Sequence, residues 1–159
     1  MGNVPGSGPG CSVYPSRVKE IRTEIEVAAS AERVWDILAD FTRYPEWNPL
    51  VPEATGELRP GATLQLRVVA GREMRFKPVV MVVERPHALR WRGVIGHRRV
   101  FSGEHWFSIA PLGPRRVKFM QGEVYTGLLV PLLARTLERD ARPAFAAMNR
   151  ALQKRAEQG

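Results

Sequence analysis

Three polar side chains lie among apolar residues in two neighbouring stretches of the sequence, and they are the first candidates for chemistry. His105 lies in FSGEHWFSIA (101–110), while Gln121 and Glu123 lie in RVKFMQGEVY (116–125). In both stretches apolar residues recur at every second position, and side chains two residues apart lie on the same face of a strand. An imidazole and a carboxylate on one wall can exchange protons with a bound molecule. His105 and Glu123 are therefore candidate acid/base groups.

The turn PLGPR (111–115) joins the two stretches, so we expect them to pair as an antiparallel hairpin. His105 then lies directly opposite or diagonal to Gln121 and Glu123, depending on the register. An unpaired buried polar group costs about 1–3 kcal/mol. The three side chains therefore either contact a ligand or satisfy one another near the rim of the sheet, and the sequence leaves both interpretations open.

Metal and cofactor chemistry has little support in the sequence. The histidines at 87, 97 and 105 lack the HExxH spacing of a zinc protease, and the single cysteine, Cys11, has no partner for a cysteine pair. No GxSxG motif marks a serine hydrolase. The run GSGPG (6–10) does not follow a strand, unlike a true phosphate-binding loop. We expect no metal and no cofactor.

The elements that must position these residues follow from periodicity. VKEIRTEIEV (18–27) alternates as a half-buried strand, and after the helix N-cap Ser30 apolar residues recur at helical spacing up to Phe41. The further segments expected to be regular are the strands ATLQLRVV (62–69), MRFKPVVMVVER (74–85) and ALRWRGVI (88–95) and a long helix over about 126–156. Pro78 should mark an edge or a bulge, because proline cannot donate to a strand ladder. This order predicts an antiparallel sheet with one face covered by the last helix.

Three segments together carry a family resemblance. The segments are IEVAASAERVWDILADFTRYPEWNPL, FSGEHWFSIAPLGPRRVKF and GEVYTGLLVPLL…FAAMNRAL. Together they resemble the START/Bet v1-like (SRPBCC) superfamily, in its polyketide cyclase/dehydrase and lipid-transport branch. The resemblance covers about residues 18–156. It implies an α+β helix-grip fold, in which a seven-stranded curved antiparallel sheet wraps around a long C-terminal helix, with two short N-terminal helices. It also implies a cavity between sheet and helix for an apolar ligand.

The segment TRYPEWNP (42–49) belongs to the second short helix, whose length Pro45 and Pro49 limit. In folds of this kind that helix lies near the cavity mouth, which would place Tyr44 and Trp47 in the apolar wall at the entrance. Alternatively, both aromatics are buried in the core. The predicted ligand-binding set combines these two aromatics with the apolar and polar residues expected to line the space between sheet and long helix. It comprises Tyr44, Trp47, Leu64, Leu66, Phe76, Trp91, His105, Phe107, Phe119, Gln121, Glu123, Leu133 and Leu137.

Three functions are compatible with these residues. The first is binding or carriage of a small hydrophobic ligand, lipid-like or aromatic, in the internal cavity. The second is an enzyme of the polyketide cyclase/dehydrase type, with His105 and Glu123 as its acid/base groups. The third is a structural or partner-binding domain whose core has collapsed and holds no ligand.

Composition sets the remaining expectations. Residues 1–17 are rich in glycine and proline and are expected to form a flexible tail, and residues 18–159 one domain. The net charge of +8 arises from basic residues at alternate strand positions, as on solvated faces, so we expect no nucleic-acid binding. No apolar run reaches the roughly 18 residues of a membrane span. We expect a cytoplasmic monomer or weak homodimer without stable membrane insertion.

Overall fold

A five-stranded antiparallel sheet forms one wall of the molecule, in the order β1-β8-β7-β6-β5. The computed structural model describes residues 17–159, so the expected flexible tail and Cys11 lie, except for Arg17, outside the described residues. The strands of this sheet are β1 (Val18–Val27), β5 (Val79–Glu84), β6 (Ala88–Ile95), β7 (Phe101–Gly113) and β8 (Arg116–Thr126). A second antiparallel sheet contains β2 (Glu53–Thr55), β3 (Gln65–Ala70) and β4 (Arg72–Phe76).

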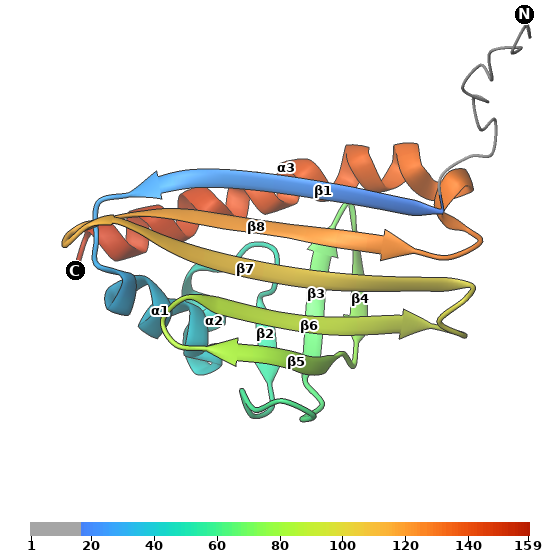
Figure 1. Cartoon of the computed structure of the whole chain (residues 1–159), viewed down its shortest axis with the longest axis horizontal. Helices are drawn as coiled ribbons and strands as arrows, with labels where there is room; N and C mark the ends of the chain where they lie inside the picture. Colours follow the sequence, from blue (N-terminus) through green and yellow to red (C-terminus); the bar gives the residue numbers. More distant parts are fainter. Residues whose placement is uncertain (1–16) are drawn as a thin grey trace, which may run out of the picture.

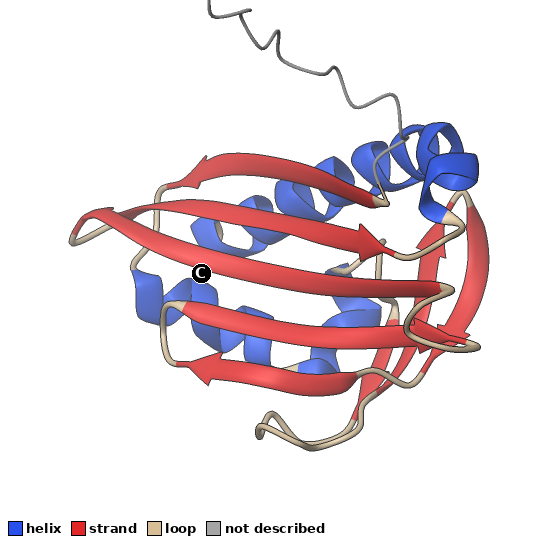
Figure 2. Ribbon diagram, turned by 45° about the vertical axis from the view of Figure 1, so that its right-hand side comes forward, coloured by secondary structure: helices blue, strands red, loops and turns tan. Residues whose placement is uncertain are grey.

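The helices and the second sheet all lie on one face of the five-stranded sheet (Figure 1, Figure 2). The helices are α1 (Ala31–Ala39), the 3-10 helix η1 (Phe41–Arg43), α2 (Tyr44–Trp47) and α3 (Val130–Glu157). The α3 helix runs along β1, while β3 and β4 cross behind the long strands. The predicted α+β helix-grip architecture, with two short N-terminal helices and a long C-terminal helix, is confirmed.

The strand count differs from the prediction of one seven-stranded sheet, because the structure has eight strands in two sheets. The stretch predicted as one strand, residues 74–85, is divided between β4 and β5 at Lys77 and Pro78. Proline has no N–H to give to a ladder, which disfavours it inside a strand that pairs on both sides. Its carbonyl still accepts a hydrogen bond from the backbone N–H of Leu64 at 2.9 Å, which ties the two sheets together at the break.

The core lies between the five-stranded sheet and α3. The buried stripe of α3 contains Phe145, Met148 and Leu152, which recur at spacings of three and four residues and therefore face one side of the helix. Complete burial of such a side chain contributes about 1.5–3 kcal/mol. The Ser30 side chain accepts the N–H of Arg33 at 3.2 Å and caps α1, as predicted. No helix within residues 17–159 is long and apolar enough to cross a bilayer.

Candidate functional site

The hairpin register places His105 directly opposite Glu123. The two residues are Cα partners in the β7–β8 ladder, and Trp91 is the partner of His105 on the other side, in β6. The predicted hairpin is thus confirmed, and of the two registers that the sequence left open the direct one is correct. Residues directly opposite each other in a ladder share a face, and His105 contacts Phe145 of α3, so Trp91, His105 and Glu123 all point to the face that α3 covers.

The expected mutual contact of the polar side chains is also confirmed. The Nδ1 atom of His105 lies 3.4 Å from Oε2 of Glu123, and its Nε2 atom lies 3.1 Å from Oε1 of Gln121. The Tyr125 hydroxyl donates to the same Oε2 atom of Glu123 at 3.0 Å. Both ring nitrogens of the imidazole therefore face an oxygen that can accept a hydrogen bond.

The orientation of the Gln121 amide follows from its surroundings. Its Nε2 atom donates to the backbone carbonyl of Phe145 at 3.1 Å and to Oδ1 of Asn149 on α3. A carbonyl oxygen can only accept, so the Gln121 nitrogen must point toward α3 and its Oε1 atom toward His105. Asn149 completes the chain by donating to Oγ1 of Thr23 on β1 at 3.0 Å. The network thus joins β7, β8, α3 and β1.

This orientation determines where the imidazole holds its proton. Because Oε1 of Gln121 accepts, the Nε2 atom of His105 donates to it and carries a hydrogen. The Nδ1 atom faces the Glu123 carboxylate, and a proton held by either of these two groups forms the hydrogen bond between them. Chemically, the pair is a site that can take up a proton and give it back.

Burial differs sharply within the pair. The whole His105 residue is 7% exposed, whereas the Glu123 side chain keeps 22% of its surface accessible. The Oε1 atom of Glu123 has no hydrogen-bond partner within residues 17–159. It lies against Gly103, in space that the Cβ atom of any other residue at position 103 would need. Burial raises the pKa of Tyr125 far above its ordinary value, and the negative charge of Glu123 and the hydrogen bond to that carboxylate raise it further. The phenol therefore remains a donor.

Aromatic rings enclose the imidazole on the remaining sides. The Trp91 ring stacks on His105 with centroids 5.7 Å apart and planes at 19°. Phe107 lies 4.6 Å away in a tilted arrangement, and Phe145 of α3 meets the imidazole edge-on at 5.0 Å. Apolar walls lower the local dielectric, which strengthens the electrostatic interactions of any charge that develops on the ring.

Tyr44 and Trp47 differ in their surroundings. Tyr44 is completely buried, its hydroxyl donates to the carbonyl of Leu38 at 2.6 Å, and burial with the nearby charge of Asp40 raises its pKa. This is the core position that the sequence left as the alternative for this residue. Trp47 packs edge-on against Tyr44 at 5.3 Å and stays half-buried. Its indole N–H is enclosed without a hydrogen-bond partner among residues 17–159.

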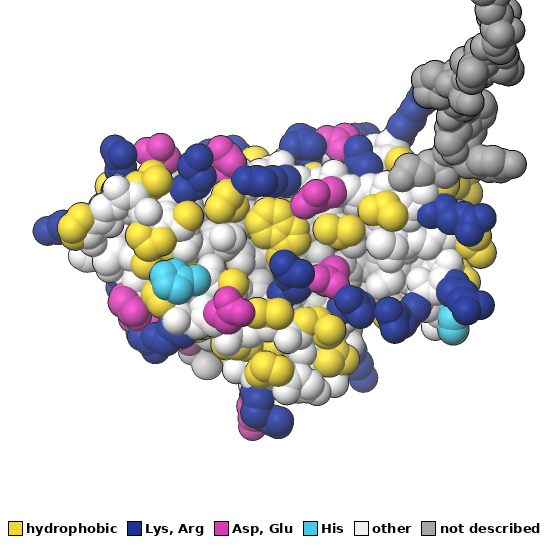
Figure 3. Space-filling model, viewed as in Figure 1, with side chains coloured by type: hydrophobic (Ala, Val, Ile, Leu, Met, Phe, Trp, Pro, Cys, Tyr) yellow, Lys and Arg dark blue, Asp and Glu magenta, His cyan; other side chains and the backbone are white. Residues whose placement is uncertain are grey.

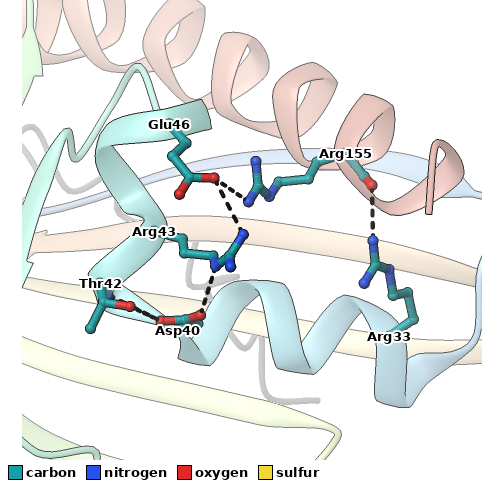
Figure 4. Close-up of polar contacts among 6 residues, drawn as sticks. All are labelled: Arg33, Asp40, Thr42, Arg43, Glu46 and Arg155. Carbon is teal, nitrogen blue, oxygen red and sulfur yellow. Dashed lines mark hydrogen bonds and ion pairs between the residues drawn. The ribbon is translucent and has the colours of Figure 1, made fainter.

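The segment that carries Tyr44 and Trp47 is held to α3 by a surface network (Figure 4). Glu46 accepts from Arg155 of α3 at 2.6 Å and lies 3.7 Å from Arg43, which also approaches Asp40. Arg33 of α1 donates to the backbone carbonyl of Arg155 at 3.4 Å. Exposed ion pairs contribute little individually, typically 0 to about 1 kcal/mol. Together they set the position of α2 against the C-terminal half of α3.

The other predicted pocket residues fall into two groups. Residues buried in the core are Leu64, Leu66, Trp91, Phe107 and Phe119. Residues that remain partly exposed are Phe76, Leu133 and Leu137. Two hollows on the molecule lie elsewhere: one of about 650 Å³ beside the loop between β6 and β7, and one of about 440 Å³ between α1, η1 and β5. The predicted internal pocket therefore stays a prediction.

Sequence reasoning missed several partners of the site. Asn149 and Thr23 complete the network from α3 and β1, Tyr125 donates to Glu123, and Gly103 makes room for the carboxylate. A signal for Asn149 was present, because it follows Phe145 at a spacing of four residues and lies one residue after Met148 in the buried stripe. A polar residue inside an apolar helix stripe needs a partner on the facing sheet.

Comparisons with known proteins agree with this architecture. A family model described as polyketide cyclase / dehydrase and lipid transport matches residues 19–157. Among solved structures, a START superfamily protein from Mycobacterium smegmatis is 28% identical with a TM-score of 0.70, over 87% of this chain and 97% of that one. The Zhui aromatase/cyclase from Streptomyces sp. R1128 is 22% identical with a TM-score of 0.72, over 89% and 94%.

A plant enzyme shares the fold as well. Norcoclaurine synthase from Thalictrum flavum, solved in complex with dopamine and hydroxybenzaldehyde, is 20% identical with a TM-score of 0.68, over 99% of this chain and 96% of that one. A search of curated protein sequences finds no significant match. The resemblance to the START/Bet v1-like superfamily that the sequence indicated is confirmed.

Proposed function

Since the chain belongs to the polyketide cyclase/dehydrase and lipid-transport family, we propose that it binds a small hydrophobic ligand between the five-stranded sheet and α3. The ligand carries a hydroxyl or carbonyl group that meets the His105–Glu123 pair. One observation carries the proposal: the Glu123 carboxylate stands on an apolar wall with a free Oε1 atom and 22% of the side chain accessible.

A purely structural role for the pair explains this arrangement less well. Buried polar groups in folded proteins are nearly always paired, and a charged group without partners is expensive to enclose. His105 and Gln121 meet this requirement, because each of their polar side-chain atoms has a partner. Glu123 is only partly buried, and its Oε1 atom has no donor within residues 17–159 and stays accessible to one. A ligand hydroxyl or a water molecule would supply that donor.

The apolar part of the proposed ligand would lie against side chains that the fold leaves half-covered. Phe76 of β4 and Leu133 and Leu137 of α3 are partly exposed, although the sequence pattern places all three on the inner side. Concave sites for small ligands are lined mainly by such apolar groups, with a few polar ones that fix orientation. The cytoplasmic location and the monomeric or weakly dimeric state are part of the same proposal.

Binding can be tested with a matched pair of probes. The fluorophore 1-anilinonaphthalene-8-sulfonate reports apolar sites, and 1-naphthol and 1-methylnaphthalene compete for them with similar shapes. We expect Glu123→Gln to weaken competition by 1-naphthol roughly fivefold to tenfold, since a hydrogen bond to a charged group contributes about 1.5–3 kcal/mol and the amide retains part of it. The same variant should leave 1-methylnaphthalene unchanged.

The control is Glu104→Gln on the neighbouring strand. Glu104 points to the other face of the sheet and pairs with Arg90 and Arg92, so its neutralisation should affect neither competitor. Equal losses for both probes in a folded Glu123→Gln variant would contradict the proposed polar contact. The pocket itself would be contradicted if the wild-type chain did not bind the fluorophore and a native mass spectrum of the purified protein showed no bound small molecule.

The proton-sharing geometry favours a second candidate function, an enzyme of the cyclase/dehydratase type. Glu123 and His105 would remove a proton from a carbon next to a carbonyl group of a bound polyketide-like chain and return it elsewhere. A 1,3-diketone in D₂O tests this step by NMR, because enzymatic removal of the α-proton appears as deuterium exchange. Loss of the catalysed exchange in Glu123→Gln but not in Glu104→Gln would support catalysis. Exchange at the uncatalysed rate in all proteins would exclude this step and leave binding alone.

A further inference from the structure

Large apolar side chains are exposed together at one end of the molecule, where the loop between β6 and β7 meets the connection from β8 to α3. We call this group the apolar end. Its members are Val94, Ile95, Val100, Leu128, Leu129 and Leu132. Their exposed fractions run from 38% for Val100 to 80% for Leu132. Exposed apolar side chains gathered at one end of a fold mark an interaction site more often than a scattered leucine does.

Backbone hydrogen bonds hold the two loops together. The N–H of Leu128 donates to the carbonyl of Arg99 at 2.9 Å, and the N–H of Leu129 donates to the carbonyl of Val100 at 3.2 Å. Gly127 adopts a φ of 128° and leaves no room for a Cβ atom against the Val100 carbonyl. The backbones of the two connections are therefore held next to each other at the apolar end.

Cationic side chains surround these residues. Arg98 and Arg99 lie in the β6–β7 loop, and Arg135 lies one helical turn after Leu132 on α3. None of the three side chains has an ion pair or hydrogen bond within residues 17–159, whereas the nearby acidic residues Glu104 and Glu138 are neutralised by their own basic partners. The space-filling view shows Lys and Arg side chains gathered at this end, with hydrophobic groups between them (Figure 3).

A hollow adds to the basic character of this end. The space of about 650 Å³ on the outer face of the sheet is lined by Arg92, His97, Arg98 and Arg99, with Glu104 already paired to Arg92. Positive potential is thus concentrated beside leucines that protrude from the fold. Leu132 is 80% exposed, although burial of a leucine side chain is favourable by about 1.5–3 kcal/mol. Insertion into an apolar environment would recover this free energy.

We propose that the apolar end docks onto the surface of an anionic lipid bilayer. Leu128, Leu129 and Leu132 enter the boundary between headgroups and acyl chains, and the unpaired arginines contact the lipid phosphates. Leu128, Leu129 and Leu132 project from the connection between β8 and α3 and from the first turn of α3, which suits a fluid surface better than a shaped protein partner. Docking is peripheral and reversible, and it is independent of the proposed ligand pocket.

Vesicle sedimentation with the full chain tests the proposal. Vesicles of phosphatidylglycerol with phosphatidylcholine should bind the protein and vesicles of phosphatidylcholine alone should not, and binding should weaken as sodium chloride is raised. Arg98→Ala and Arg99→Ala should each reduce the partition coefficient between vesicles and water about fivefold. Leu132→Ser should reduce it about tenfold. These positions are exposed, so the variants should stay folded.

Matched controls lie at the opposite end of the sheet. Leu112, 42% exposed, and Arg115 lie at the β7–β8 turn, and Leu112→Ser and Arg115→Ala should leave binding unchanged. Depth is measured separately by attaching a nitrobenzoxadiazole fluorophore to Leu132→Cys or Leu112→Cys in a Cys11→Ser background. Emission should shift to the blue on anionic vesicles only for the label at position 132.

Two outcomes would overturn the proposal. Binding that is absent, or equal for both vesicle types and insensitive to all variants, excludes an anionic membrane as the partner. Binding that depends on the arginines but not on Leu132, with no spectral shift at position 132, shows charge attraction without insertion. That result would direct attention to an acidic macromolecule in place of a bilayer.

Discussion

Gly103 provides a sharp test of how the His105–Glu123 site is built. A Cβ atom at this position would overlap Oε1 of Glu123 and lie 3.3 Å from its carboxyl carbon. In Gly103→Ala the Oε1 end of this side chain must shift, and we expect the shift to break the contacts of Oε2 with His105 and with the hydroxyl of Tyr125. Tyr125 is 6% exposed, so its hydroxyl would be left buried without an acceptor.

The magnitude follows from these contacts. Leaving the buried hydroxyl unpaired costs about 1–3 kcal/mol, and the displaced carboxylate recovers part of its hydration because it is already partly exposed. Replacing glycine by alanine in a strand returns roughly 0.5–1 kcal/mol. We therefore expect Gly103→Ala to lower the free energy of unfolding by about 1–2 kcal/mol, measured by urea denaturation at an unchanged m-value.

Gly93 is the matched control, because it is the ladder partner of Gly103 and a Cβ atom there meets nothing within 4 Å. Gly93→Ala should be neutral or slightly stabilising. In a Glu123→Ala background the cost of Gly103→Ala should disappear, since the group it displaces is gone. Equal effects of Gly103→Ala with and without Glu123 would refute the reasoning that the glycine exists to seat the carboxylate.

Two further predictions concern protons in the core. The pKa values of Tyr44 and Tyr125 are raised in the folded state above the ordinary value of 10.0, so the unfolded chain releases these protons first and stability should fall as pH rises above about 10; in a Tyr14→Phe background, which removes the third tyrosine of the chain, phenolate absorbance should appear only together with unfolding, and Tyr44→Phe should remove part of the pH dependence. An early, fully reversible phenolate signal from either residue in the native protein would contradict this. In the folded protein, ¹⁵N NMR should find a hydrogen on Nε2 of His105, because this atom donates to Oε1 of Gln121; an Nε2 atom without a hydrogen in the wild-type protein would show that the Gln121 amide is oriented the other way.

Much of the fold was predictable because its elements depend on local periodicity. The alternation in residues 18–27 and the cap at Ser30 predicted β1 and the start of α1 at the bounds that the structure has. The break at Pro78 was visible as an irregularity but not as a change of sheet, because whether a chain continues in the same sheet after a proline depends on which strands are available nearby. The six strands expected from periodicity become eight because the stretch of residues 74–85 is divided between β4 and β5 and because the three-residue strand β2 was not expected, so the count of seven implied by the resemblance was wrong.

The sequence by itself determined which polar residues share the inner face, since the side-chain period of a strand is two and no tertiary contact can change it. His105, Gln121 and Glu123 follow from that rule alone. Only the tertiary structure decided that His105 meets Glu123 directly and that Asn149 of α3 orients the Gln121 amide. Register depends on the turn and the irregularity near Pro111 and Gly113, and the rotation of α3 depends on packing of its whole apolar stripe. The register and the rotation of α3 both depend on many contacts between residues far apart in the sequence, and local sequence patterns do not contain these contacts.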